Sequence, residues 1–535
     1  MKILFVSTRK NSDPTERELY EMDLMIDVLG FDRSLFDLGL LTILGGTPKR
    51  FEVSMQDEYL APIDYDEPCD LVALSAKTSC SVRAYEVAAE FRRRGKKVVL
   101  GGIHCSLRPE EALERVDYIV TGEAEQTWLT FLEDFEAGHP ERRYDTAQFP
   151  PMSEVPFPSF GQEDSKRFLL HQIQTTRGCP FQCRFCSVPD ISGQAFRFKP
   201  VQRVIDEIRA LPRRGPLVER IKSLYIVDDN FISRTRYTKE LLEALVPLRK
   251  RGEIPDWSAE TTLNVATDEE LLDLFRDAGC TTLIIGFESV SQETLKSMAK
   301  GINFCLSYQE ATERIHKRGI TIVGNFIVGF DTDTLSVFKD TRDFVFENNI
   351  LYPFFSILTP MPGTELHDEY DAAGRLDHKD WARYDTRHVT FDPAQMSREQ
   401  LMDGYVWLYE QCYTSDAAWN NLRNHWQRPE RAGAGMLERM FVKWRIRRSK
   451  TITEQGRVFC KRAMDHAGTH KGQGDMAQLL YYLDSGHFAE FMARYKSVRY
   501  VQHAREFESI AISGNETEMQ WNDQRLKRNT EKAGV

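Results

Sequence analysis

Short apolar runs alternate with helical segments along most of this 535-residue chain, and this alternation limits its possible folds more than any other feature. Strands that alternate with helices are typical of parallel sheets, because a crossover helix joins each strand to the next. The alternation occurs in two blocks, one before residue 140 and one after residue 171. The expected class is therefore α/β, with more than one domain.

The first block, residues 1–140, predicts a doubly wound sheet. Ligands of such sheets bind beyond the carboxyl ends of the strands, so the residues after each strand are candidates for binding. The candidates are Ser75 and Thr78 after the third strand, Gly101, Gly102 and His104 after the fourth, and Gly122 and Glu123 after the fifth. The expected strands are residues 3–6, 52–56, 71–75, 97–100 and 118–121, with a helix over 81–94.

The second block, residues 171–370, predicts six strand–helix units that form a partial barrel. Chemistry in such barrels is found at the carboxyl ends of the strands. Between the blocks, residues 141–170 contain four prolines in one run of twelve, which indicates an extended linker. The expected strands are residues 172–176, 223–227, 258–261, 282–286, 321–328 and 354–358, with helices over 201–211, 238–250, 268–278, 306–318 and 335–347.

Three cysteines follow the first barrel strand with the spacing C-x3-C-x2-C, at Cys179, Cys183 and Cys186. Thiolates are the ligands that iron–sulfur clusters prefer, and a four-iron cube held by three cysteines keeps one iron open. A structural zinc site is the alternative, but it needs four ligands, and only His171 lies near. Disulfides are typical of small secreted chains, which this chain does not resemble.

The cysteine loop, with Phe185 before its last cysteine, resembles the signature of radical S-adenosylmethionine enzymes. The resemblance implies that the three cysteines hold a 4Fe–4S cluster whose open iron binds S-adenosylmethionine. Reductive cleavage would give a 5′-deoxyadenosyl radical that abstracts hydrogen from the substrate. A flavodoxin or ferredoxin would supply the electron.

Later strand ends carry residues that resemble this family's cofactor contacts. By resemblance, Asp228 or Asp229 would contact the methionine amino group, and Glu288 the ribose or methionine part. Asn325 would lie near the adenine, with Pro362 in a P-x-P-G-T loop that closes over it. Other readings stay open, because the two aspartates could cap the next helix, as could Ser289 or Ser291. Solvated surface roles are expected for Arg177 and Lys199.

The first block resembles the Rossmann-like domain of cobalamin-binding members of the same family, through D-L-V-A-L-S, V-V-L-G-G-I-H, P-E-E-A-L and Y-I-V-T-G-E-A-E. That resemblance implies a bound cobalamin. The D-x-H-x-x-G motif that supplies an axial histidine to cobalt in many cobalamin proteins is absent. His104 is therefore expected to line the domain surface or to contact a cofactor tail.

Composition narrows the classes of partner and location. The net charge of −11 argues against a broad nucleic-acid-binding surface, and no apolar run reaches the roughly 20 residues that span a bilayer. A cytoplasmic location is expected.

From residue 397 the pattern is helical. Residues 440–448 are a basic stretch, which could form one face of a helix that packs on the barrel or could contact an anionic membrane surface or a lipid substrate. Residues 371–535 are expected as a helical region, in which Trp381, Tyr384 and Phe391 mark a short irregular segment that could form a lid.

The resemblance implies a cobalamin-dependent methyltransferase that acts on an unactivated carbon of a small-molecule or lipid-like substrate. A radical enzyme that does not methylate, such as a cyclase or a rearrangement catalyst, remains open. So do a tRNA- or peptide-modifying enzyme and a non-catalytic corrinoid or iron–sulfur sensor. The sequence does not identify the substrate.

Overall fold

The computed structural model describes residues 1–10, 26–27, 31–160, 167–211, 223–300, 306–377, 379–426, 458–459 and 476–510. These residues form two compact units. The first unit takes the described residues of Met1–Glu21, Phe31–Asp229 and Thr359–Phe391. The second takes those of Met22–Gly30, Asn230–Leu358 and Asp392–Val535.

The first unit contains a six-stranded sheet whose strands all pair in parallel, in the order β2-β1-β3-β4-β5-β6. The five strands expected in the first block are all present. A sixth, short strand lies within the range expected to be a linker. The strands are β1 (Lys2–Ser7), β2 (Glu52–Asp57), β3 (Leu71–Ser75), β4 (Lys97–Gly101), β5 (Tyr118–Thr121) and β6 (Arg143–Asp145).

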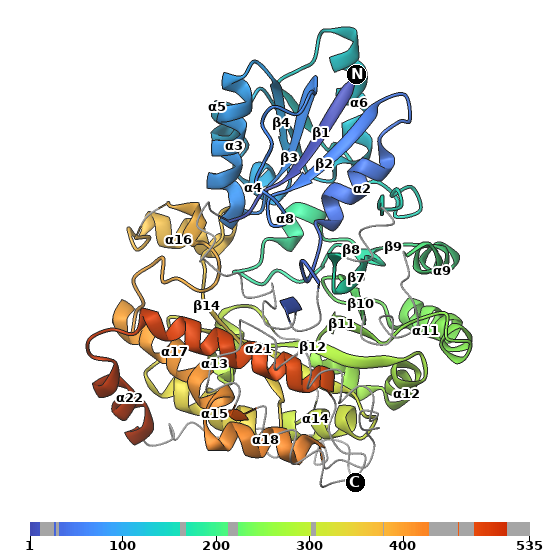
Figure 1. Cartoon of the computed structure of the whole chain (residues 1–535). Helices are drawn as coiled ribbons and strands as arrows, with labels where there is room; N and C mark the ends of the chain where they lie inside the picture. The colour runs from blue at the N-terminus through green and yellow to red at the C-terminus, as the bar shows by residue number, and fades with distance from the viewer. Residues whose placement is uncertain are drawn as a thin grey trace, which may run out of the picture. The chain divides into compact units, whose positions relative to one another are not determined.

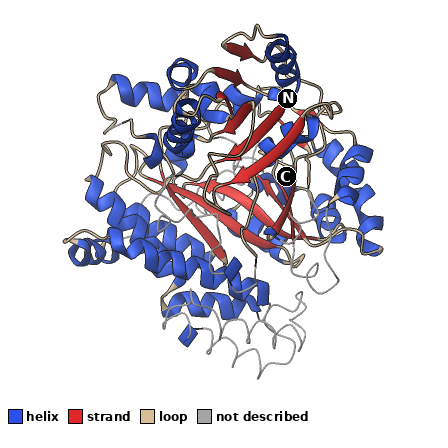
Figure 2. Ribbon diagram, turned by 45° about the horizontal axis from the view of Figure 1, so that its top comes forward, coloured by secondary structure: helices blue, strands red, loops and turns tan. Residues whose placement is uncertain are grey.

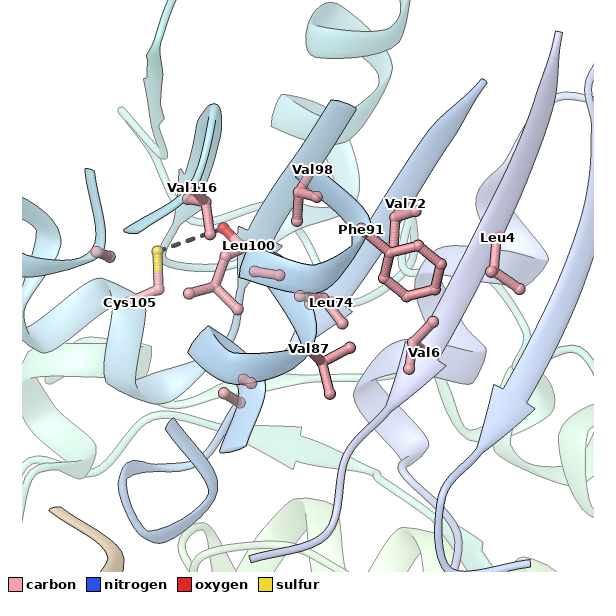
Figure 3. Close-up of a cluster of buried hydrophobic side chains, with 14 of the residues drawn as sticks. Leu4, Val6, Val72, Leu74, Val87, Phe91, Val98, Leu100, Cys105 and Val116 are labelled. Carbon is pink, nitrogen blue, oxygen red and sulfur yellow. Dashed lines mark hydrogen bonds between the residues drawn. The ribbon is translucent and has the colours of Figure 1, made fainter. Parts of the chain in front are cut away.

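Helices cover both faces of this sheet (Figure 1). One face carries α3 (Ser81–Arg93), α4 (Ile103–Leu107) and α5 (Pro109–Arg115), and Phe91 of α3 is fully buried in the core on that side (Figure 3). The other face carries α2 (Leu38–Gly46) and α6 (Ala124–Ala137), with Trp128 in its core. Burial on both faces explains why β1, β3 and β4 are almost continuously apolar.

A second six-stranded sheet has the order β14-β13-β12-β11-β10-β7, so β7 and β14 are its edge strands. Figure 2 shows the strands of the chain in red and the helices in blue. The pairs β7–β10, β11–β12, β12–β13 and β13–β14 are parallel. The expected α/β class with a partial, strand–helix barrel is confirmed. The strands are β7 (Leu170–Ile173), β10 (Ser223–Ile226), β11 (Trp257–Thr261), β12 (Cys280–Glu288), β13 (Thr321–Val328) and β14 (Tyr352–Ile357).

The crossover helices match the expected ranges within a few residues. Asp268 caps α12 and Ser291 caps α13, so a helix-capping role is confirmed for Ser291. Ser397 and Gln400 form a capping box at the start of α17, where the helical region was expected to begin. The helices are α9 (Val201–Ala210), α11 (Thr235–Lys250), α12 (Glu269–Asp277), α13 (Gln292–Ser297), α14 (Tyr308–His316) and α15 (Ser336–Glu347).

The helices after the sheet are α17 (Arg398–Tyr413), α18 (Asp416–Trp426), α21 (Met476–Met492) and α22 (Tyr500–Ser509). In the second unit, α17 packs on β14, where the Tyr413 hydroxyl donates to the carbonyl oxygen of Pro353 at 2.7 Å. The basic stretch 440–448 lies outside the described residues. Among the helices that the structure describes, none combines the length and apolarity needed to cross a membrane.

Candidate functional site

The cysteine loop leaves the second sheet after β7 and is closed at its base by two short antiparallel strands. These are β8 (Thr176–Arg177) and β9 (Arg197–Phe198). The Cys179 amide donates to the carbonyl oxygen of Gly193 at 3.1 Å, and Cys186 to that of Cys183 at 3.0 Å. Gly178 has φ +91°, and a Cβ there would lie 2.3 Å from a backbone oxygen of Ala195. The loop therefore requires glycine directly before its first cysteine.

The three loop thiols form no disulfide and are partly exposed. Burial raises the pKa of Cys186 to about 12, with Cys183 and Cys179 contributing, so this thiol is protonated at neutral pH unless a metal binds it. Among the described residues, no three His, Cys, Asp or Glu side chains converge closely enough for one metal ion. A four-iron cube needs no such convergence, because each thiolate binds a different iron. The donor set therefore fits a cluster better than mononuclear zinc.

The carboxyl side of the cysteine loop is held by α16 (Glu365–Ala372), which follows the P-x-P-G-T segment. Arg184, between the second and third cysteines, forms ion pairs with Glu365 at 3.1 Å and with Glu369. The Leu366 amide donates to the Arg184 carbonyl oxygen at 3.2 Å. Pro362 is buried in this segment. The predicted Pro362 loop and the cysteine loop both belong to the first unit.

The two adjacent aspartates after β10 have different environments. Asp228 is buried, and its carboxylate accepts from the amides of Thr175 at 2.6 Å and Thr176 at 3.0 Å, and from the Thr175 hydroxyl. Burial raises the pKa of Asp228, and these hydrogen bonds oppose that rise. Asp229 is exposed and interacts electrostatically with Cys186. The structure thus gives Asp228 a supporting role beneath the cysteine loop and leaves Asp229 accessible.

Glu288 and Asn325 lie on neighbouring strands of the second unit. Asn325 pairs with Gly286 across β12 and β13, two residues before Glu288. Glu288 has φ +63°, a conformation that is rare for a residue with a side chain and that is found most often at functional sites. Its carboxylate forms an ion pair with Lys300, a buried residue that the sequence did not single out. Gly286 makes room for this pair, since a Cβ there would lie 2.4 Å from the Glu288 carboxylate.

The glycine turns at the strand ends of the first sheet pack against the chain itself. Gly102 has φ +95°, and a Cβ there would lie 2.8 Å from the Ala76 amide nitrogen and 3.0 Å from the Ser75 hydroxyl. The Gly122 amide donates to the Ser106 hydroxyl at 2.8 Å. These contacts bring the residues that follow β3, β4 and β5 to one edge, and Ser75, Thr78 and Gly101 lie on the same edge.

His104 does not line the domain surface, as was expected from its position in the turn after β4. It is fully buried and contacts the rings of Tyr85 and Trp381 edge-on, with centroids 6.0 and 5.5 Å away. Its Nε2 lies 3.5 Å from a carboxylate oxygen of Glu111, which also accepts from the Trp381 indole at 3.0 Å. The helix α5, packed over this turn, is the reason for its burial.

The expectation that Lys199 and Arg177 are solvated is wrong. Lys199 is 2% exposed and forms an ion pair with Glu207 at 2.6 Å. Burial lowers the pKa of Lys199 and raises that of Glu207. The residue follows β9, and its amide donates to the carbonyl oxygen of Thr175 at 2.8 Å, a tertiary contact that the sequence does not reveal.

The Arg177 guanidinium pairs with Glu123 at 2.9 Å and Glu125 at 2.6 Å. Burial disfavours the charged form of this guanidinium and by itself would lower the pKa of Arg177. The two carboxylates outweigh that effect and hold the pKa of Arg177 above its ordinary value. Arg197 also pairs with Glu123 and was missed by the sequence reasoning. No signal in the sequence pointed to it, because the two-residue strand β9 that contains it is seen only in the structure.

Residues 173–345 match the Radical SAM superfamily, a range that begins in β7 and contains the cysteine loop. The chain is 33% identical over 388 residues to the bacteriochlorophyllide d C-12(1)-methyltransferase of Chlorobaculum tepidum, covering 71% of this chain and 83% of that one. It is 30% identical to the hopanoid C-2 methylase of Rhodopseudomonas palustris, covering 67% of this chain and 68% of that one.

A solved structure has a similar fold, that of the cobalamin-dependent S-adenosylmethionine radical enzyme OxsB with aqua-cobalamin and S-adenosylmethionine bound. Its TM-score is 0.59 at 15% identity, covering 99% of this chain and 84% of that one. Together with the sequence relatives, this fold and the cysteine loop define the class of protein.

The chain belongs to the radical SAM superfamily, and within it to the family that contains the bacteriochlorophyllide and hopanoid methylases. It is a radical SAM enzyme. The cofactors of this superfamily are a 4Fe–4S cluster and S-adenosylmethionine.

Proposed function

We propose that this chain is a cobalamin-dependent radical SAM methyltransferase that acts on a carbon atom of a small-molecule or lipid-like substrate. The observation that carries the proposal is the extent of the similarity to a C-methyltransferase. It covers 388 residues, whereas the superfamily match covers only residues 173–345. The likeness to the C-methyltransferase therefore extends well beyond the radical SAM core.

The proposed arrangement assigns residues 1–140, together with β6, to a cobalamin-binding-type domain, the rest of 141–170 to a linker, 171–370 to the radical SAM core and 371–535 to a helical region. When bound, the cluster supplies the electron that cleaves S-adenosylmethionine, and the cobalamin supplies the methyl group. The electron would come from a flavodoxin- or ferredoxin-type donor.

Each proposed cofactor contact has a local reason. Cys179, Cys183 and Cys186 would hold the cluster, because their loop is closed at its base and their thiols form no disulfides. The strand-end residues Asp229, Glu288 and Asn325, with Pro362, would bind S-adenosylmethionine. Ser75, Thr78, Gly101, Gly102 and Gly122 would face the corrinoid at the carboxyl edge of the first sheet.

Three of the residues predicted from sequence have protein partners that occupy their side chains. Asp228 holds the turn at Thr175, His104 is packed among aromatic rings, and Glu123 pairs with two arginines. We therefore leave their side chains out of the proposed cofactor contacts.

The proposal is tested with the full-length protein, reconstituted anaerobically with iron, sulfide and hydroxocobalamin. The protein is incubated with methyl-labelled S-adenosylmethionine, a reductant, and either a bacteriochlorophyllide or a hopanoid, the substrate types named for the two relatives. Mass spectrometry then looks for a labelled product, and chromatography for 5′-deoxyadenosine. The matched control is Cys183→Ala.

A labelled methyl product together with bound corrinoid supports the proposal. Formation of 5′-deoxyadenosine without corrinoid binding or methyl transfer contradicts it and favours a radical enzyme that does not methylate. If Cys183→Ala holds as much iron as the wild type, the cluster assignment itself is wrong.

A further inference from the structure

Four buried charged side chains join the first sheet to the base of the cysteine loop within the first unit. Glu123 follows β5, and its carboxylate accepts from Arg177 at 2.9 Å and from Arg197 at 2.8 Å. Glu125 adds a pair with Arg177 at 2.6 Å. The four side chains are between 6% and 16% exposed. We call this group the Glu123 clamp.

The clamp contacts the cysteine loop at its base, where β8 and β9 pair. Arg177 and Arg197 are paired residues of β8 and β9, the two strands that close the loop, and Arg177 lies two positions before Cys179. Arg197 also donates to the carbonyl oxygens of Ser192 at 2.9 Å and Pro150 at 3.0 Å. One carboxylate therefore fixes both ends of the loop.

The other end of the clamp lies at the strand edge of the first sheet. Glu123 follows Gly122 and precedes α6, so its backbone belongs to the turn after β5. Its side chain makes no capping bond to the helix that it precedes. A carboxylate at this position would ordinarily stabilise the helix N-terminus, but here it reaches the two arginines instead.

Two carboxylates against two guanidinium groups make a neutral cluster in a site that is largely removed from water. Charge-assisted bonds of this kind are strong and directional, and the planar fork of arginine fixes geometry as well as distance. A movement of the turn at Gly122 is therefore transmitted to β8 and β9 through short bonds rather than absorbed by flexible side chains.

We propose that Glu123 is a positioning residue, and that its clamp couples the occupant of the strand-end edge to the cysteine loop. The inference rests on the proposed function, in which that occupant is a corrinoid and the loop holds the cluster. Cluster loading and cobalamin binding then strengthen each other. By linkage, each raises the affinity for the other by the same factor.

The test measures the dissociation constant of hydroxocobalamin for the full-length protein, by absorbance titration, with and without the reconstituted cluster. Coupling between two sites typically changes affinity by about 5- to 150-fold. For the wild type, the ratio of the dissociation constant without the cluster to that with the cluster is expected in this range. In Glu123→Gln the ratio is expected to fall close to one. The control is Glu136→Gln, which removes the same charge from an exposed pair on α6, the helix that Glu123 precedes.

A second variant serves if Glu123→Gln does not fold. Arg197→Lys keeps the charge but loses the fork, so the ratio is expected to fall between those of the wild type and Glu123→Gln. The inference is overturned if the wild-type ratio is one, or if both folded variants keep the wild-type ratio. If the wild type binds no hydroxocobalamin, the proposed function fails, and this inference fails with it.

Discussion

At the scale of the residue, the adjacent pair Asp228 and Asp229 shows how one turn serves both structure and chemistry. The first carboxylate is buried and accepts from two amides of the preceding segment, while the second is exposed beside the cysteine loop. Neither caps the next helix, since α11 begins after Arg234. The two residues should therefore respond differently to substitution.

Asp228→Ala is expected to destabilise the protein, because the amides of Thr175 and Thr176 lose their acceptor in a buried site. Each unsatisfied buried donor costs about 1–3 kcal/mol. The melting midpoint, measured by calorimetry, should fall by several degrees. Asp229→Asn should keep the midpoint but lose S-adenosylmethionine cleavage. Equal midpoints for the two variants would contradict this division of roles.

The carboxyl group of Asp333, which follows β13, is expected to make the stability of the folded protein depend on pH. Its carboxyl accepts from the amides of Gly329 at 2.9 Å and Phe330 at 3.0 Å, and burial raises its pKa to about 7. Because the folded pKa lies above the unfolded value of about 3.9, the folded state binds the extra proton between these limits. Its contribution to stability is therefore lost as pH rises toward and through 7.

Asp333→Asn stays uncharged at all these pH values, and its side-chain oxygen can still accept. The wild type should lose stability relative to this variant between pH 5 and pH 8, by at most about 3 kcal/mol. Melting midpoints of both proteins across that range provide the measurement. Parallel curves for the two proteins would show that Asp333 does not titrate in this range.

At the scale of the element, the cysteine loop depends on how β8 and β9 close it. Gly178 lies between Arg177 and Cys179 with positive φ, and its α-carbon lies close to the backbone at Ala195. Arg184 and α16 hold the far side of the loop. A small change at the base of the loop therefore moves all three cysteines together.

Gly178→Ala is expected to lose most of the iron that the wild type binds, because its Cβ would clash with a fixed backbone oxygen 2.3 Å away. The control is Gly252→Ala, which also has positive φ, at +71°, but has open space around the position of a Cβ. It should lose about 1 kcal/mol of stability and keep its iron. Iron and sulfide analysis after reconstitution measures the difference, and similar iron contents would refute it.

At the scale of the whole molecule, residues distant in sequence build the first unit. The segment Thr359–Phe391 belongs to it, 130 residues after Asp229, and is tied to the residues that follow β1 by the pair of Asp385 with Lys10 at 2.7 Å. Arg387 and His388 bond the same carboxylate at 3.0 and 2.9 Å. Burial alone would raise the pKa of Asp385, but these three partners hold it well below its ordinary value.

Asp385→Asn is expected to destabilise the protein at neutral pH by about 3–5 kcal/mol, because buried cations lose their partner. A depressed folded pKa gives stability above the unfolded value of about 3.9, which is lost as pH falls below it. The difference in melting midpoint from the wild type should thus shrink below pH 4. Asp371→Asn, in an exposed pair of the same segment, should change little.

Much of the fold could be predicted because its signals are local. Apolar runs of four to eight residues and helical periodicity depend on neighbours in sequence, so all five strands expected in the first sheet and all six expected in the second are present. The cysteine spacing is local as well. The strand β6 was not predicted because it has only three residues, and the helix α2 was not predicted because its nearly continuous apolar run lacks helical periodicity.

The partners of the charged residues could not be predicted. Arg177 and Lys199 were expected in solvent, and His104 at a surface, yet all three are held inside the first unit. Arg177 meets Glu123 across 54 positions of sequence, and Arg197 meets it across 74. A single sequence does not show which distant carboxylate covers which cation.

The sequence by itself determined eleven strands, the crossover helices between them, the two blocks in which they follow each other along the chain and the three thiols of one loop, because periodicity and spacing act over a few residues. Only the tertiary structure decided which polar side chains support the site and which remain accessible to ligands. The physical reason is that the cost of burying a charge depends on the partners that folding brings to it, and these come from distant parts of the chain.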